Sequence, residues 1–148
     1  MKEFIKYIRA PDKRTIDREY ETQVIASKYD FAPKIYEYTV TYDPNKKYYE
    51  GKIIMENLEE MCIADMYGDN AEDIPLYVWE QMRDIIKTLY NNEGIEYIDI
   101  TGYNFIEKDE KVYIIDFGHA KYSKKKTLVD PFLQKFLDGA NEFNPEFK

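Results

Sequence analysis

The feature that most limits how this chain can fold is a spaced set of polar residues around a short apolar segment. Asp99 and Asn104 lie five residues apart, and Asp116 follows Asn104 by twelve residues. Residues 112–115 (VYII) predict a buried strand that ends at Asp116. Gly118 then permits a sharp turn. The pattern predicts a loop, a β-hairpin and a second loop, with the polar residues on the loops.

The first half of the chain predicts three strands and one helix. The expected strands are residues 3–8, 35–42 and 48–55. A helix is expected from Ile16 to about Tyr29, with Thr15 as its N-cap. Its apolar face repeats every four residues, at Ile16, Tyr20 and Val24. Residues 43–45 (DPN) predict the turn that joins the last two strands.

The second half predicts two longer helices and a hairpin. One helix should begin near Pro75 and end at Gly94, a natural left-handed cap. Its apolar stripe is Val78, Trp79, Met82, Ile85, Ile86 and Leu89. Residues 107–111 (EKDEK) predict the polar tip of the hairpin. A last amphipathic helix is expected over residues 127–138.

The composition excludes several classes of function. The chain is 44% apolar and 16% aromatic, which predicts a ring-lined core rather than disorder. A net charge of -8 argues against bulk nucleic-acid binding, and we interpret the basic run at residues 124–126 as a solvated loop. The single cysteine, Cys62, excludes an internal disulfide and a cysteine-rich zinc site.

No membrane span or signal peptide is expected, because no apolar run approaches about 18 residues. We therefore expect a soluble cytoplasmic protein. The bias toward Lys, Asn, Ile and Tyr is typical of AT-rich genomes, viral ones among them, and a viral source would place the protein in the host cytoplasm.

The residue types at Asp99, Asn104 and Asp116 suit phosphoryl transfer. A carboxylate such as Asp99 can accept a hydrogen bond from an acceptor hydroxyl and orient it. An amide oxygen and a second carboxylate are ligands that Mg²⁺ prefers. Taken singly, Asp99 and Asn104 can be ordinary turn residues and Asp116 a strand-end cap. The combination at this spacing favours the chemical interpretation.

Residues 97–104 (YIDITGYN) and 114–118 (IIDFG) resemble the catalytic loop and the metal-binding strand end of the protein-kinase-like superfamily. The resemblance implies that Asp99 faces the acceptor hydroxyl. It implies that Asn104 and Asp116 hold Mg²⁺ on the phosphates of ATP.

The loop is most similar to that of small atypical kinases. Thr101 stands two residues after Asp99, where conventional Ser/Thr kinases carry Lys and kinases of the RIO and KEOPS-complex type tend to carry Ser or Thr. The resemblance implies a catalytic role for Thr101. Tyr97 and Ile98 replace the usual His and Arg, so activation-loop phosphorylation is not expected to be a switch. The only histidine, His119, is expected to be a loop residue.

The resemblance extends upstream to the nucleotide. Lys6 resembles the strand lysine that contacts the phosphates, and Glu21 resembles the helix glutamate that pairs with it, with Glu19 as the competitor. Glu56 and Leu58 resemble the hinge whose backbone binds the adenine edge. The ordinary alternatives are that Lys6 is a solvated lysine on an edge strand and that Glu21 is an exposed glutamate. Residues 56–58 would then be the ordinary end of a strand.

The resemblance implies an α+β, reduced two-lobed kinase-like fold. Residues 1–148 would form one domain, with a small antiparallel sheet lobe at 1–58 and a mainly helical lobe at 59–148. Five residues precede Lys6, so we expect no counterpart of the two strands and glycine-rich loop that cover the phosphates in family members. The Ala-Pro-Glu segment is also missing after Gly118.

Two functions follow from these observations. The first is a minimal phosphotransferase that uses ATP and Mg²⁺ and resembles a Ser/Thr protein kinase. The second is a kinase-derived binding module that regulates another protein, such as a full-length kinase. We favour the enzyme because Asp99, Asn104 and Asp116 are all intact. The expected partners are a nucleotide and a protein substrate or partner kinase.

Overall fold

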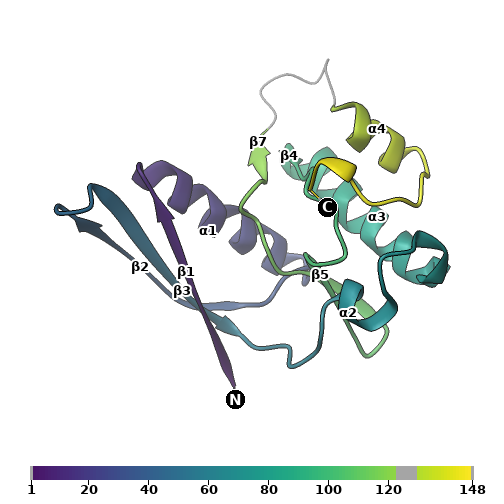
Figure 1. Cartoon of the computed structure of the whole chain (residues 1–148), viewed down its shortest axis with the longest axis horizontal. Helices are drawn as coiled ribbons and strands as arrows, with labels where there is room; N and C mark the ends of the chain where they lie inside the picture. The colour runs from purple at the N-terminus through teal and green to yellow at the C-terminus, as the bar shows by residue number, and fades with distance from the viewer. Residues whose placement is uncertain (1, 123–129, 148) are drawn as a thin grey trace. The chain divides into compact units, whose positions relative to one another are not determined.

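The computed structural model describes residues 2–122 and 130–147 (Figure 1). The chain divides into two compact units, Met1–Leu58 and Glu59–Lys148, at the boundary expected between the two lobes. Helices together with small antiparallel sheets confirm the α+β class. That the two units form one kinase-like domain stays a prediction. The basic run at residues 124–126 and the start of the expected helix at 127–138 lie outside the described residues.

The first unit contains a three-stranded antiparallel sheet in the order β1-β3-β2. Its strands are β1 (Glu3–Ala10), β2 (Ile35–Asp43) and β3 (Tyr48–Glu56). The turn between β2 and β3 is held by Asp43, whose Oδ1 accepts the N–H groups of Asn45 at 2.9 Å and Lys46 at 3.2 Å. All three strands and this turn agree with the sequence prediction to within a few residues.

Helix α1 (Lys13–Lys28) packs against all three strands of this sheet (Figure 1). The N-cap is Asp12, whose Oδ1 accepts the N–H of Thr15 at 2.7 Å and its hydroxyl at 2.9 Å. The prediction of Thr15 as the cap was wrong because the helix begins nearly one turn earlier. The buried face is Ile16, Glu19, Thr22, Gln23 and Ala26.

Gly51 on β3 allows α1 to lie close to the sheet. A Cβ atom at this position would lie 2.4 Å from Cγ2 of Ile16, which is fully buried. We predict that Gly51→Ala lowers the free energy of unfolding by about 1–3 kcal/mol, because the extra methyl overpacks the core. Denaturant unfolding measures this directly.

The Ile16→Ala/Gly51→Ala double variant supplies the control. Removing Cγ2 makes room for the new methyl, so the double variant should lose less stability than the sum of the two single variants. Strictly additive losses would contradict the steric explanation.

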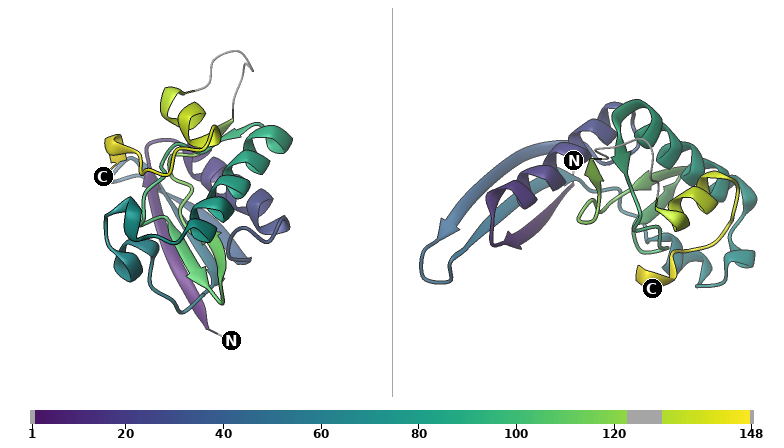
Figure 2. Two further views of the ribbon diagram at one scale, coloured as in Figure 1. Left: turned by 90° about the vertical axis from the view of Figure 1, so that its right-hand side faces the viewer. Right: turned by 90° about the horizontal axis from the view of Figure 1, so that it is seen from above.

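The second unit is built around α3 (Leu76–Glu93). The helix follows Pro75 and ends at Gly94, which has a φ of 67°, as predicted. The predicted apolar stripe is the set of residues that α3 buries. Helix α4 (Pro131–Leu137) and the strand β6 (Lys111–Ile114) both contact α3 (Figure 2).

Strand β6 pairs antiparallel with β5 (Phe105–Lys108) to form the predicted hairpin. The turn of the hairpin is shorter than the expected residues 107–111. The strands extend to Lys108 and Lys111, so only Asp109 and Glu110 form the turn. Both turn residues have positive φ, of 51° and 65°. Positive φ at both central residues is the geometry of a type I′ turn, whose twist matches that of the paired strands.

Several short elements were not predicted. They are α2 (Ile63–Tyr67), the 3₁₀ turns Ala71–Asp73 and Pro145–Phe147, and the paired strands β4 (Ile95–Glu96) and β7 (Lys121–Tyr122). The described part of the last helix begins at Pro131, where Asp130 caps it by accepting the N–H groups of Phe132 and Leu133 at 2.9 and 3.1 Å. Among residues 2–122 and 130–147, no helix has the length and apolar character of a membrane span.

Candidate functional site

Asn104 and Asp116 lie at the open end of the β5–β6 hairpin. Phe105 pairs with Ile114, and the backbone N–H of Ile115 donates to the carbonyl of Asn104 at 2.9 Å. Asp116 is the next residue along the chain. The hairpin therefore brings together the two residues predicted to hold a metal ion.

Asn104 also closes the loop that carries Asp99. Its Nδ2 donates to the backbone carbonyl of Asp99 at 2.8 Å, and its N–H donates to the carbonyl of Thr101 at 3.3 Å. Thr101 is buried and donates its N–H to the same Asp99 carbonyl at 3.1 Å. The Asn104 amide nitrogen is a hydrogen-bond donor, and its bond to the Asp99 carbonyl fixes the orientation of the amide. Its Oδ1, the acceptor atom, is the one that can serve as a cation ligand.

Tyr97 anchors both loops from inside the core. Its ring is fully buried and meets the rings of Phe105 and Phe117 edge-on, at centroid distances of 6.0 and 5.8 Å. Its hydroxyl donates to the backbone carbonyl of Asp116 at 2.5 Å. The Asp116 carboxylate accepts the N–H of Gly118 at 2.8 Å. Tyr97 thus ties the Asp116 backbone to the aromatic core.

The carboxylate of Asp99 has a partner that the sequence did not predict. His119 lies in a loop, as expected, and its Nδ1 is 2.8 Å from Oδ2 of Asp99. Asp99 is itself mostly buried. The signal in the sequence was that the only histidine of the chain follows Asp116 by three residues.

The C-terminal segment holds the Asp99 loop from the other side. Asn144 is 2% exposed, and its N–H and Nδ2 donate to the carbonyls of Ile100 and Ile98, each at 2.8 Å. These carbonyls flank Asp99 on both sides. The ring of Phe143 packs at a tilt of 43° against that of Trp79, with centroids 5.0 Å apart, and so holds the segment in place. No local pattern could reveal Asn144, because its contacts span more than forty residues.

In the first unit, Lys6 forms an ion pair with Glu19 at 2.5 Å. The prediction that Glu21 is the partner was wrong. Glu19 is 7% exposed on the inner face of α1, whereas Glu21 is exposed. Residues two apart on a helix lie on nearly opposite faces, so only one of the two glutamates can face the sheet. The competing candidate named from the sequence is the correct one.

The predicted hinge residues lie at the exit of β3. The N–H of Glu56 donates to the carbonyl of Lys34 at 2.8 Å, and the N–H of Asn57 donates to that of Lys2 at 3.2 Å. Leu58 is buried.

The oxygen donors of the second unit fit Mg²⁺ rather than a metal held entirely by protein. Within the part of the chain that the structure describes, no three or more His, Cys, Asp and Glu side chains gather in a way that could hold a metal ion. Mg²⁺ is commonly bound by one or two carboxylates, with substrate phosphates and water completing its shell. Asn104 and Asp116 match that smaller requirement.

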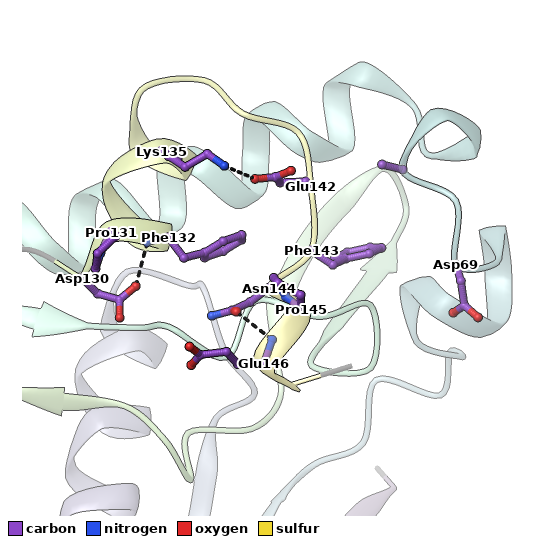
Figure 3. Close-up of a pocket in the computed structure, with 11 residues that line it drawn as sticks. Asp69, Asp130, Pro131, Phe132, Lys135, Glu142, Phe143, Asn144, Pro145 and Glu146 are labelled. Carbon is purple, nitrogen blue, oxygen red and sulfur yellow. Dashed lines mark hydrogen bonds and ion pairs between the residues drawn. The ribbon is translucent and has the colours of Figure 1, made fainter.

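A pocket of about 570 Å³ lies between α4 and the segment after it (Figure 3). Its charged lining residues are Asp69, Asp130, Lys135, Glu142 and Glu146. Lys135, the one cation among them, is ion-paired with Glu142 at 3.1 Å. The excess of carboxylates disfavours a phosphate-bearing ligand, so this pocket is not a candidate nucleotide site.

Comparison with known proteins adds no relative: no protein-family model matches the chain, and no curated protein matches it. The similarity to protein kinases therefore rests on the residues themselves.

We predict that Asn144→Ala destabilises the second unit by about 1–3 kcal/mol. The change removes one hydrogen bond to the part-buried carbonyl of Ile98, which then keeps only the N–H of Ile100 as a donor. Trp79 is the only tryptophan and its ring packs against that of Phe143, so its fluorescence reports unfolding of this region. Asn70→Ala is the control, because Asn70 makes no side-chain cap bond and is exposed. Equal stability of the two variants would contradict a restraining role for Asn144.

Proposed function

We propose that this protein is a minimal phosphotransferase of the protein-kinase-like type, which transfers the γ-phosphoryl group of ATP to a hydroxyl in the presence of Mg²⁺. The observation that carries the proposal is the joining of Asp99, Asn104 and Asp116 through one loop and one hairpin. Phosphoryl transfer needs positioned groups and neutralised charge more than covalent chemistry from the protein.

In this proposal, Asn104 and Asp116 bind the metal-nucleotide complex. Asn104 contributes Oδ1, and Asp116 contributes its carboxylate. Bound Mg²⁺ supplies neutralisation of the phosphate charge. The backbones of both residues are fixed before any ligand arrives, by the Ile115 N–H on one side and the Tyr97 hydroxyl on the other. Such preorganisation reduces the cost of ordering the site on binding.

Asp99 orients the acceptor. Its carboxylate accepts a hydrogen bond from the acceptor hydroxyl and takes the proton as the hydroxyl oxygen attacks the γ-phosphorus. The bond from the γ-phosphorus to the bridging oxygen breaks at the same time, and that oxygen leaves with its electrons on ADP. Thr101 is buried in the loop, so we assign it to support of the Asp99 backbone.

The first unit contributes nucleotide contacts in the same proposal. A strand lysine paired with a helix glutamate is the arrangement by which kinases hold the nucleotide phosphates, and the Lys6–Glu19 pair matches it. The Glu56 carbonyl and the Leu58 N–H are assigned to the adenine edge.

One observation favours the alternative, a binding module that regulates a partner protein. β1 is an edge strand, and Phe4 and Tyr7 on it are 50% and 58% exposed, with Ile5 also exposed. An exposed apolar edge strand offers its backbone and side chains to another chain. This surface suits a partner protein whether or not the chain is an enzyme.

We predict that ATP stabilises the protein only when Mg²⁺ is present. At about 100 times its dissociation constant, the nucleotide should add about 2.7 kcal/mol to the free energy of unfolding, which a thermal-shift titration detects. Asp116→Asn should abolish the Mg²⁺-dependent part of the shift, because the amide keeps the shape and loses the charge.

Asp84→Asn, an exposed substitution on α3, is the matched control and should behave as the wild type. If millimolar MgATP gives no shift, the nucleotide proposal fails. If Asp116→Asn binds MgATP normally, Asp116 is a structural cap.

We predict that Asp99→Ala reduces phosphoryl transfer by about 10²–10⁴-fold and leaves MgATP affinity nearly unchanged, because Asp99 contacts the acceptor and not the metal. The assay is single-turnover transfer from labelled ATP to the protein itself, to acceptor proteins and to water. Wild-type protein that binds MgATP and transfers to none of these would favour the binding module. In that case Phe4→Ser/Tyr7→Ser should abolish partner binding, and Asp99→Ala should not.

A further inference from the structure

The only histidine of the chain contacts the carboxylate that the proposed function assigns to the acceptor. Nδ1 of His119 lies 2.8 Å from Oδ2 of Asp99. The two side chains differ in exposure: that of His119 is 59% exposed, and that of Asp99 is 13% exposed. The exposed imidazole ring therefore contacts a carboxylate that is mostly buried.

The direction of this hydrogen bond follows from the chemistry of the two groups. An ionised carboxylate has no hydrogen to donate, so the hydrogen must be on Nδ1 of His119. Oδ2 of Asp99 is then occupied by the imidazole. Oδ1 is the oxygen that can accept a hydrogen bond from an acceptor hydroxyl.

The ring of His119 is itself held in place. It packs against the ring of Phe147, with centroids 4.9 Å apart and a tilt of 49°. The backbone on either side is fixed by the bond from Gly118 N–H to Asp116 and by the bond from Ala120 N–H to Phe117. The turn that presents Asp116 therefore also sets the position of His119.

The His119–Asp99 pair is expected to affect the reaction rate much more than the stability of the fold. A hydrogen bond whose donor side chain is as exposed as that of His119 contributes little to the free energy of folding. Orientation acts differently, because displacement of a reacting group by about 1 Å can cost about a hundredfold in rate. The pair can therefore matter for turnover while it hardly affects stability.

We propose that His119 is a positioning residue for Asp99. It donates Nδ1–H to Oδ2, stops rotation of the carboxylate and presents Oδ1 to the acceptor. The role deepens the proposed phosphotransfer function and rests on it. The pairing itself can be tested independently of activity.

The first experiment reads the pairing by nitrogen NMR. With one histidine in the chain, the imidazole signals need no assignment. At about pH 8, where an ordinary imidazole is neutral, the wild type should show the Nδ1–H tautomer. Asp99→Ala should shift it toward Nε2–H, the form that free imidazole side chains prefer. Asp109→Asn, at the hairpin turn, is the control and should match the wild type. An Nε2–H tautomer in the wild type would overturn the proposal.

The second experiment reads the consequence for turnover in the full chain. His119→Phe keeps a ring beside Phe147 and removes the donor. His119→Asn keeps an N–H donor near the position of Nδ1. We expect His119→Phe to lower the single-turnover rate by about ten- to a hundredfold. MgATP affinity and thermal stability should stay close to wild type, and His119→Asn should recover most of the rate.

The outcomes separate the two proposals. Wild-type protein that transfers phosphoryl groups, with both His119 variants equally fast, would overturn the positioning role and leave the proposed function standing. A parallel loss of rate and stability in His119→Phe, without rescue by Asn, would also overturn it, because that result indicates a structural residue. Wild-type protein that transfers nothing would overturn the proposed function, and the tautomer would then decide whether His119 holds Asp99.

Discussion

The candidate site depends on Asn104, because this residue joins the loop that carries Asp99 to the hairpin that leads to Asp116. Its backbone carbonyl accepts from Ile115, its N–H donates to Thr101, and its side-chain nitrogen donates to the carbonyl of Asp99. A side chain with a donor on one edge and an acceptor on the other is required here. Aspartate has nearly the same shape, but when ionised it would set a negative charge against the Asp99 carbonyl and remove one of that carbonyl's two donors, the other being the N–H of Thr101.

Aromatic packing makes this hydrogen-bonded junction stiff. Tyr97 contacts Phe105 at the start of the hairpin and Phe117 just after its end. The fully buried tyrosine meets its need for a polar partner at the Asp116 carbonyl. The same ring therefore packs the core and positions the loop. Because one residue both packs in the core and holds the Asp116 loop, the position of that loop is set by the rigid core.

The sequence predicted the elements whose signals are local and repeated. The stripe on α3, its glycine cap and the β5–β6 hairpin were predicted because periodicity and turn chemistry are properties of neighbouring residues. The three polar residues of the candidate site were proposed from their spacing along the chain, and their role stays a prediction. The short α2, with five residues, is too brief to show a period. β4 and β7 are two-residue strands defined only by their pairing with each other.

The errors in the first unit have a common physical cause. Tyr20 and Val24 were placed on the inner face of α1 because apolar residues usually mark the buried face, yet both are half-buried. The buried positions include Glu19 and Gln23, which are polar. Glu19 is buried beside Lys6, and such a pair cannot be predicted from hydrophobicity.

In the second unit, the contacts of His119 and Asn144 were not predicted because their partners are distant in sequence.

The restraint that Asn144 places on the Asp99 loop determines when, during synthesis of the chain, that loop becomes fixed. The ribosome synthesises Asn144 forty-five residues after Asp99, and Phe147 later still. The hairpin and α3 consist of local contacts that form as soon as they emerge, whereas the bonds to Ile98 and Ile100 wait for the tail. A nascent chain that stops before residue 144 thus contains Asp99, Asn104 and Asp116, but its Asp99 loop lacks both hydrogen bonds from Asn144. The restraint on the Asp99 loop is therefore added only after the hairpin and α3 have been synthesised.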